Sequence, residues 1–136
     1  MQRIRSKDTR AELLLRRALW KEGYRYRKNL KVLPGTPDIV LTKYRIAIFV
    51  DSEFFHGRDW DVLQARLKKG NNGELWISKI KRNMERDYEV DQRLRVDEWT
   101  VLHFWDKDIE KHLDECVQSI KEVIFEAVTN DTDYTR

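Results

Sequence analysis

The sequence predicts an α/β domain in which a mixed β-sheet is flanked by helices. Two short apolar segments, 38–41 and 46–50, are rich in β-branched residues and are joined by a short connection, which is typical of a hairpin. A long helical pattern at 74–96 separates this hairpin from another apolar strand at 99–105. Strands before and after such a helix pair in parallel through a crossover, so the sheet should contain both pairing directions.

Shorter elements complete this prediction. Apolar residues recur at helical spacing over 9–22, and Gly23 is a suitable residue to end that helix. The remaining elements, in chain order, are an edge strand at 24–27, a short helix at 60–69, a loop at 70–73, and a last helix capped by Asp106 or Asp108. We predict one domain over 1–129 and a disordered tail at 130–136.

Composition limits the classes of function. No stretch approaches the roughly 18 apolar residues of a membrane span, and no apolar segment follows the basic start as in a signal peptide. The single cysteine, Cys116, excludes an internal disulfide and fits a reducing cytoplasm. Basic residues concentrate in the first two thirds of the chain, which suits binding of a polyanion such as DNA.

In a hairpin the start of the first strand lies beside the end of the second, and both of these ends carry acidic residues here. Asp38 opens the first strand, while Asp51 and Glu53 follow the end of the second. Asp38 alone is better explained as a turn residue after proline. Together these carboxylates, with the Val50 main-chain carbonyl, offer the hard oxygen ligands that Mg²⁺ prefers. We therefore predict a divalent-metal site for phosphodiester hydrolysis.

His56 follows the same strand end, where a general base or acid is needed. His103 alternates within a strand and His112 falls on a charged helix face, so neither is expected to have a special role. Phe54 and Phe55 cannot both point inward from an extended segment, so one is expected to be an exposed wedge that stacks on bases.

The long helix carries two polar residues within its apolar stripe. The stripe consists of Trp76, Ile80, Asn83, Asp87, Val90 and Leu94. A buried carboxylate needs partners, so Asp87 either belongs to a structural network or orients a catalytic group. Lys79, Arg82 and Arg86 occupy the neighbouring flank, from which they can reach phosphates.

Glu12 has two explanations. Thr9 and Glu12 match a capping box at the start of the first helix, which requires no active site. The alternative is a carboxylate that holds a metal-bound water.

Several motifs occur together in a consistent order from about Arg3 to Trp105. They are Asp8-Thr9 with Glu12, Pro34-Gly35-Thr36-Pro37-Asp38, Phe49-Val50-Asp51 with Phe54-Phe55-His56, Trp76, Lys79-Ile80, Asn83, Glu85-Arg86-Asp87, and Trp99-Thr100-Val101-Leu102 before Trp105. With these motifs the chain resembles the very-short-patch mismatch repair endonucleases (Vsr), a branch of the PD-(D/E)xK nuclease superfamily with a restriction-endonuclease-like fold.

The resemblance implies a Mg²⁺-dependent enzyme that nicks one strand of double-stranded DNA, with Mn²⁺ as a possible substitute. Asp38 and the Val50 carbonyl would hold the metal, and His56 would activate water. Glu12 and Asp87 would act through waters or orient the histidine. The DNA-contacting residues would be Phe54, Phe55, Trp76, Lys79, Arg82, Asn83 and Arg86.

The sequence also departs from the family pattern. Well-known members carry a Cys/His zinc site around the histidine, where this chain has Glu53 and Gly57 to Trp60, so we predict no structural zinc. The alternative functions are a phage, mobile-element or restriction-type nuclease of the same fold, and a DNA-binding protein without catalytic activity.

Overall fold

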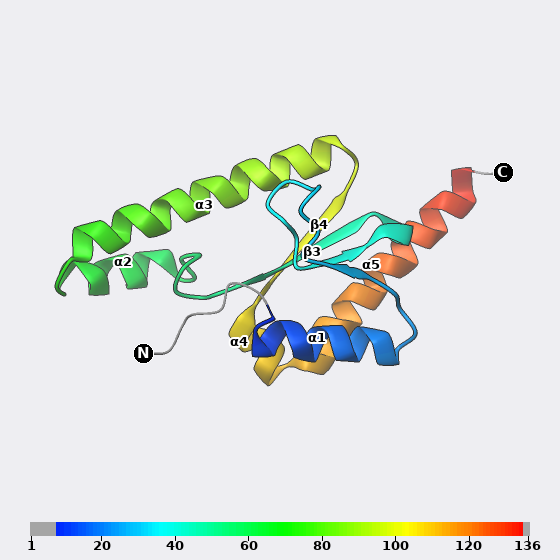
Figure 1. The fold of residues 1–136 in the computed structure, drawn as a ribbon, viewed down its shortest axis with the longest axis horizontal. Coiled ribbons are helices and arrows are strands. Elements are labelled where there is room, and N and C mark those ends of the chain that lie inside the picture. Colours follow the sequence, from blue (N-terminus) through cyan, green and yellow to red (C-terminus); the bar gives the residue numbers. More distant parts are fainter. Residues whose placement is uncertain (1–7, 135–136) are drawn as a thin grey trace.

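The protein contains one mixed sheet with helices on both faces (Figure 1). The computed structural model describes residues 8–134. Its strands are β1 (Arg27–Lys28), β2 (Ile39–Leu41), β3 (Ile46–Asp51) and β4 (Thr100–Trp105). They lie side by side in chain order; β1 with β2 and β2 with β3 are antiparallel, whereas β3 with β4 is parallel. The predicted α/β, restriction-endonuclease-like class is confirmed.

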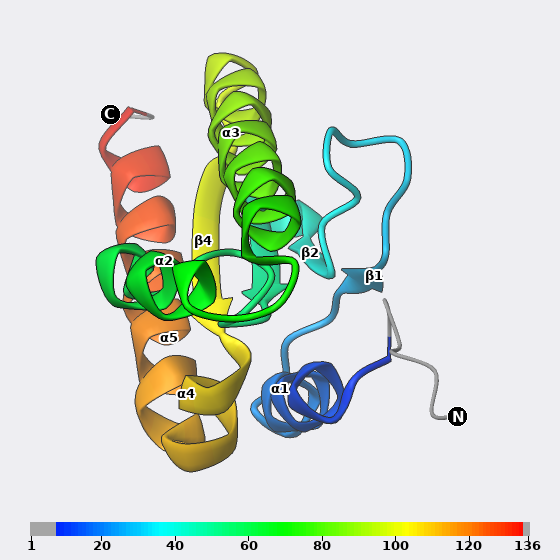
Figure 2. The same cartoon turned by 90° about the vertical axis from the view of Figure 1, so that its left-hand side faces the viewer.

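Helices of different lengths lie on both sides of this sheet. They are α1 (Arg10–Lys21), the 3₁₀ turn η1 (Thr42–Tyr44), α2 (Trp60–Lys68), α3 (Gly73–Val96), α4 (Asp106–Lys111) and α5 (Leu113–Tyr134). Figure 2 shows α1 and α3 on opposite sides of the strands. No helix within the described part of the chain is long and apolar enough to span a bilayer.

Strand alternation divides the interior into two cores. Ile46 and Ile48 point toward α1, α4 and α5, where they form the larger core with residues such as Leu15 and Ile120. Ala47 and Phe49 point to the other face and pack with Leu94 of α3 and Val101 of β4. The face toward α3 is the one that carries the polar groups described below.

The structure corrects three predicted elements. The expected single last helix is broken at His112, which lies between α4 and α5 rather than on a helix face. Trp105, not Asp106 or Asp108, precedes α4 as its cap residue, without a side-chain hydrogen bond. Apolar residues continue at helical spacing across the break, from Ile109 and Leu113 to Cys116 and Ile120, so the periodicity gave no sign of it.

The other two corrections concern the predicted edge strand and the predicted tail. The predicted edge strand at 24–27 is reduced to Arg27–Lys28, because Tyr24 and Tyr26 pack against the larger core instead of extending the ladder. The predicted tail at 130–136 is helical as far as Tyr134, where α5 ends, and residues 135–136 lie outside the described part.

Candidate active site

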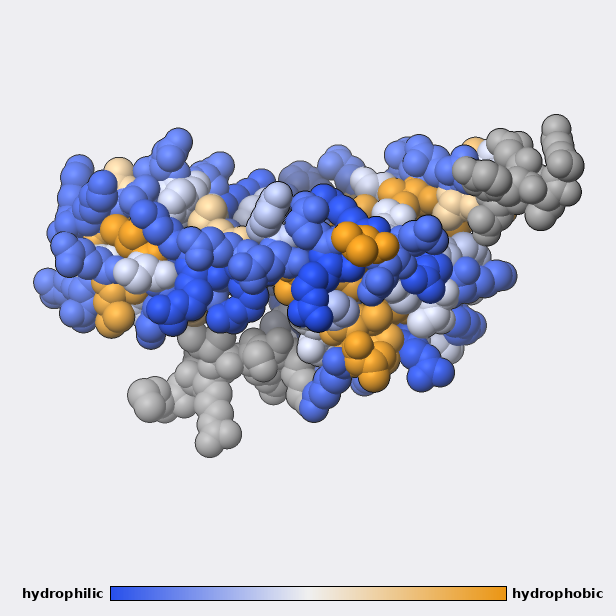
Figure 3. All heavy atoms as spheres, turned by 90° about the horizontal axis from the view of Figure 1, so that it is seen from above, coloured by the Kyte–Doolittle hydropathy of each residue, from blue (hydrophilic) through white to orange (hydrophobic). Residues whose placement is uncertain are grey.

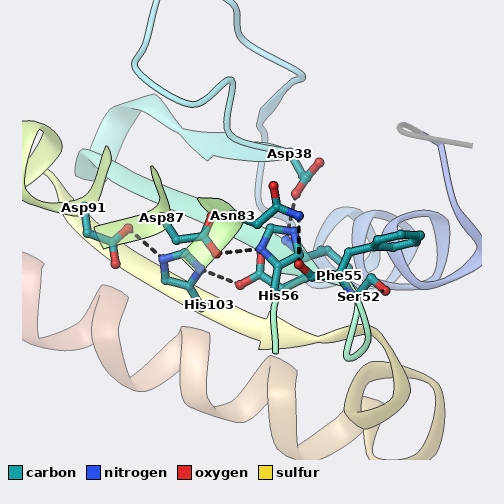
Figure 4. Close-up of polar contacts among 10 residues, drawn as sticks. Asp38, Ser52, Phe55, His56, Asn83, Asp87, Asp91 and His103 are labelled. Atoms are coloured by element: carbon teal, nitrogen blue, oxygen red, sulfur yellow. Dashed lines mark hydrogen bonds and ion pairs between the residues drawn. The ribbon is translucent and has the colours of Figure 1, made fainter. Parts of the chain in front are cut away.

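A cavity of about 560 Å³ opens where β2 begins and β3 ends, between the loop before β2 and the middle of α3. Pairing of Ile39 with Ile48 brings these two strand ends together, as the hairpin predicted. The predicted site residues that line the cavity are Asp38, Val50, Asp51, His56, Asn83, Arg86 and Asp87. Figure 4 shows Asp38 just before β2, His56 in the turn after β3, and Asn83 and Asp87 on α3, all at one place.

Asp38 is held in place by the neighbouring strand. Its Oδ2 accepts a hydrogen bond of 2.7 Å from the Val50 main-chain N–H. Burial, followed by a hydrogen-bonding contact with Glu12, raises the pKa of Asp38 to about 8, although the bond from Val50 lowers it. Two carboxyl groups in contact share a proton unless a cation is bound, so this pair is a place where positive charge is stabilised.

The oxygen atoms around Asp38 fit a hard divalent cation. In an extended strand the N–H and C=O of one residue point to the same side. The Val50 carbonyl therefore faces the side on which Asp38 accepts the Val50 N–H. Among the described residues, no three His, Cys, Asp or Glu side chains are placed to hold a metal by themselves. Mg²⁺ suits such a sparse set because it binds through one or two carboxylates and keeps several waters.

Glu12 closes the predicted capping box and also lies beside Asp38. Its carboxylate accepts from the Thr9 N–H and its own N–H donates to the Thr9 hydroxyl, so the capping box is confirmed. The side chain is only 2% exposed, and Arg16 lies 3.5 Å from it. Because Glu12 also contacts Asp38, the cap fixes this carboxylate beside the candidate metal site.

His56 lies in the tight turn that follows β3, where its N–H donates to the Ser52 carbonyl. The ring Nδ1 donates a hydrogen bond of 2.6 Å to Asp87 Oδ2, across the cavity on α3. Burial lowers the pKa of His56, but the bond to Asp87 and the charge of Asp51 outweigh it, so the pKa is raised above 6.5. With Nδ1 engaged by Asp87, Nε2 is the ring nitrogen that can take a proton from water.

The same turn carries an aromatic cluster, which consists of Phe54, Phe55 and Trp76. The Trp76 ring lies 5.4 Å from that of Phe54 and 6.3 Å from that of Phe55, centre to centre. All three side chains are half-buried. The two phenylalanines do not point to opposite sides as expected of an extended segment, because the chain turns after Asp51 and both rings meet Trp76. Asn83 supports this turn by donating a 2.9 Å hydrogen bond to the Phe55 carbonyl.

Cationic side chains surround this cluster and the cavity. Lys79 Nζ lies 5.3 Å from the centre of the Trp76 ring. Arg86 lines the cavity, and Arg82 is exposed on the same helix. A polyanion placed across α3 would therefore meet aromatic rings, positive charge and the acidic site together.

Comparisons with known proteins agree with this arrangement. The family model described as DNA mismatch endonuclease Vsr matches residues 1–62. A type II nicking enzyme of Neisseria meningitidis serogroup C, V.NmeDIP, is 45% identical over 91% of this chain and 82% of its own length. The chain belongs to the Vsr family of DNA endonucleases. A type II nicking enzyme of Haemophilus parainfluenzae is 43% identical to this Vsr-family protein over 90% of this chain and 85% of its own length. The DNA mismatch endonuclease Vsr of Escherichia coli is 33% identical over 78% of this chain and 66% of its own length.

Asp51 has a partner in this Vsr-family protein that the sequence did not suggest. Its Oδ2 accepts a 2.7 Å hydrogen bond from His103 Nδ1, and the other ring nitrogen of His103 donates to Asp91 at 2.7 Å. Burial lowers the pKa of His103, but these two acids outweigh it and raise the pKa to about 9. The expectation that His103 is ordinary is therefore wrong, and the Asp51 carboxylate bonds this histidine through Oδ2.

The spacing of Asp87 and Asp91 was the part of this arrangement that the sequence could show. Asp87 and Asp91 are four residues apart and so share one face of α3. In the parallel register His103 lies opposite Phe49, which places it on the same face as Asp51, two residues further along β3. The register of a parallel pair was not readable from the sequence, and alternation alone left His103 on an unspecified face.

The structure also corrects the prediction for Glu53. Arg58 donates 2.9 Å hydrogen bonds to Glu53 and to Asp108 at the start of α4. Glu53 and Arg58 line a separate cavity with Ser52 and Asp106, so Glu53 lies outside the cavity that contains Asp38. The turn at 52–59 reverses the chain, and for this reason Glu53 does not continue toward the side of Asp51. Arg58 also lies 5.5 Å from the centre of the Trp105 ring, which ties the turn to β4.

Proposed function

We propose that this Vsr-family endonuclease nicks one strand of double-stranded DNA in a Mg²⁺-dependent reaction that serves mismatch repair. The observation that carries the proposal is the position of Asp38 and His56 on the wall of one cavity. Strand nicking is supported by relatives named type II nicking enzymes, and mismatch repair by the relative named DNA mismatch endonuclease Vsr.

Asp38 and the Val50 carbonyl are the groups that would hold the metal, with Glu12 positioned beside them. A bound Mg²⁺ would supply positive charge that stabilises the developing charge on the phosphoryl oxygens. His56 would accept the proton of the attacking water at Nε2, because Asp87 holds its Nδ1. Asp87 therefore fixes the ring orientation and stabilises the imidazolium that forms.

The aromatic cluster and the cations of α3 would position the duplex. The half-buried rings of Phe54, Phe55 and Trp76 supply apolar surface that can insert between bases. Lys79, Arg82 and Arg86 would neutralise phosphates, and Asn83 would keep the turn that carries the rings in place. A mismatched pair is more easily unstacked than a matched one, so such a wedge favours mismatched sites.

Nicking of covalently closed plasmid, and of synthetic duplexes with and without a T:G mismatch, tests this proposal directly. We expect nicks with Mg²⁺ or Mn²⁺ and none with EDTA. His56→Ala should slow nicking by about 10²- to 10⁴-fold, and Asp38→Asn should abolish it.

The controls for this experiment lie on the opposite helical layer. His112→Gln and Asp114→Asn change exposed residues at the α4–α5 junction and on α5, and both should nick at the wild-type rate. Nicking that persists in EDTA, or full activity of Asp38→Asn, would refute the metal site. Salt-dependent DNA binding without any cleavage would favour a DNA-binding protein instead.

A further inference from the structure

His103 occupies the centre of a chain of charged groups beside the candidate active site. Nδ1 lies 2.7 Å from Asp51 Oδ2, and Nε2 lies 2.7 Å from Asp91 Oδ1. Ionised carboxylates only accept hydrogen bonds, so each ring nitrogen must donate and the ring is an imidazolium. The ring also stacks on Phe49, with centres 5.0 Å apart and planes 13° apart, which fixes its orientation.

Asp51 is within reach of a second histidine. Its other oxygen, Oδ1, lies 4.0 Å from His56 Nδ1, the atom that donates to Asp87 at 2.6 Å. At 4.0 Å Asp51 Oδ1 makes no hydrogen bond with His56, but a small rotation of the carboxylate would bring it within reach of the donor that Asp87 holds. The Asp51 residue is only 7% exposed, so its charge needs a partner from the protein.

We propose that His103 is a positioning residue that holds the Asp51 carboxylate away from His56, so that His56 keeps Asp87 as its partner. Without His103, the remaining ion-pair partner recorded for Asp51 among the described residues is His56, through Nδ1, and Asp51 would turn toward it. The imidazole would then rotate away from the geometry set by Asp87, and Nε2 would no longer face the attacking water. The inference rests on the proposed role of His56 in nicking, and Figure 4 shows the whole chain of contacts from Asp91 to Asp87.

Two near-isosteric substitutions separate positioning from packing. In His103→Asn the amide nitrogen replaces Nδ1 and can still donate to Asp51, whereas in His103→Gln it replaces Nε2 and can donate only to Asp91. We expect His103→Asn to retain most of kcat. His103→Gln and His103→Leu should lose about 10- to 100-fold in kcat, as is common when the partner that orients a functional group is removed, while KM for DNA stays within about twofold. His112→Gln is the matched control and should leave both constants unchanged.

A double-variant comparison tests whether His103 acts through Asp51. If it does, His103→Leu should have little further effect on kcat in an Asp51→Asn background. The same loss in both backgrounds, or equal losses in the Asn and Gln variants, would overturn the proposal. If His103→Leu fails to fold, as judged by circular dichroism, the Asn and Gln pair still decides the outcome.

Imidazole nitrogen NMR gives a readout that does not depend on turnover. The wild-type protein should show His56 with its proton on Nδ1 bonded to Asp87, and both nitrogens of His103 protonated. His103→Gln should shift the His56 Nδ1 resonance and His103→Asn should not. An unshifted His56 signal in His103→Gln would contradict the positioning role. Absence of nicking by the wild type would refute the proposed function, but the NMR comparison would still test the arrangement.

Discussion

At the scale of single residues, each side chain of the site makes a hydrogen bond or an ion pair with a neighbouring group. Asp38 accepts from the main chain of β3, and Glu12 closes its own helix while it contacts Asp38. His56 donates to Asp87, and His103 neutralises Asp51 and Asp91. Arg16 lies against Glu12, and the pair that Glu12 forms with Asp38 is the one to which we assign the proposed metal.

The pKa of Asp38 predicts a pH-dependent stability. In the folded protein this pKa is about 8, against 3.8 for a free side chain, so the folded state binds a proton that the unfolded chain has released. Stability should therefore fall as pH rises from about 4 to about 8. Asp38→Asn removes this cost and keeps an acceptor for the Val50 N–H. Without metal at pH 8, it should raise the free energy of unfolding by on the order of 1 to 3 kcal/mol.

Urea unfolding in EDTA at pH 5 and pH 8 measures this effect, with Asp114→Asn as the control. The wild type and Asp114→Asn should both lose stability at the higher pH, whereas Asp38→Asn should lose much less. Mg²⁺ should restore stability to the wild type at pH 8 and leave Asp38→Asn unchanged. An equal pH response in the Asp38→Asn variant and the wild type would contradict the assignment.

At the scale of elements, the turn that follows β3 decides where His56 lies. Gly57 has a φ of +71°, and a Cβ there would lie 2.6 Å from Met84 Sδ and 3.2 Å from Ile80 Cγ2 on α3. Arg58 fastens the other side of the turn to Asp108. The turn is thus pressed against α3, and this contact sets the separation of His56 and Asp87.

Gly57→Ala should move this turn away from α3 and lower the nicking rate by about tenfold or more, because small displacements of catalytic groups are costly. Gly23→Ala is the matched control, since Gly23 also has a positive φ of +97° but nothing lies within 4 Å of its added Cβ. Both variants should lose about 1 to 2 kcal/mol of stability from backbone strain, measured by thermal unfolding. Equal nicking rates in the two variants would show that the turn can shift without moving His56.

The sequence was sufficient to predict the hairpin and the long helix α3. The hairpin placed Asp38 beside Val50, and the α3 stripe placed Asn83 and Asp87 toward the cavity, because pairing and helical period are local rules. The break at His112 and the pairing of His103 with Asp51 depend on contacts between distant segments. No local rule carries that information, and for the same reason Glu53 was assigned to the wrong side of the turn.

At the scale of the whole molecule, the polar face of the sheet and the surface of α3 lie on the same side, which carries the candidate active site. Seen from above, this side is mostly hydrophilic, with apolar residues in separate patches (Figure 3). The larger core lies on the opposite face, between the strands and α1, α4 and α5. That core supports the ends of β2 and β3, and α1 on this face contributes Glu12 to the contact with Asp38.

The location of a bound cation in the complex with DNA tests the central assignment most directly. Crystals of the protein with a duplex and Mn²⁺ give an anomalous signal that marks the metal. We predict a peak in contact with the Asp38 carboxylate and the Val50 carbonyl, with the His56 ring facing the same phosphate. A peak at Asp51 and Asp91 with His103 displaced, or a phosphate bound away from His56, would contradict the assignment.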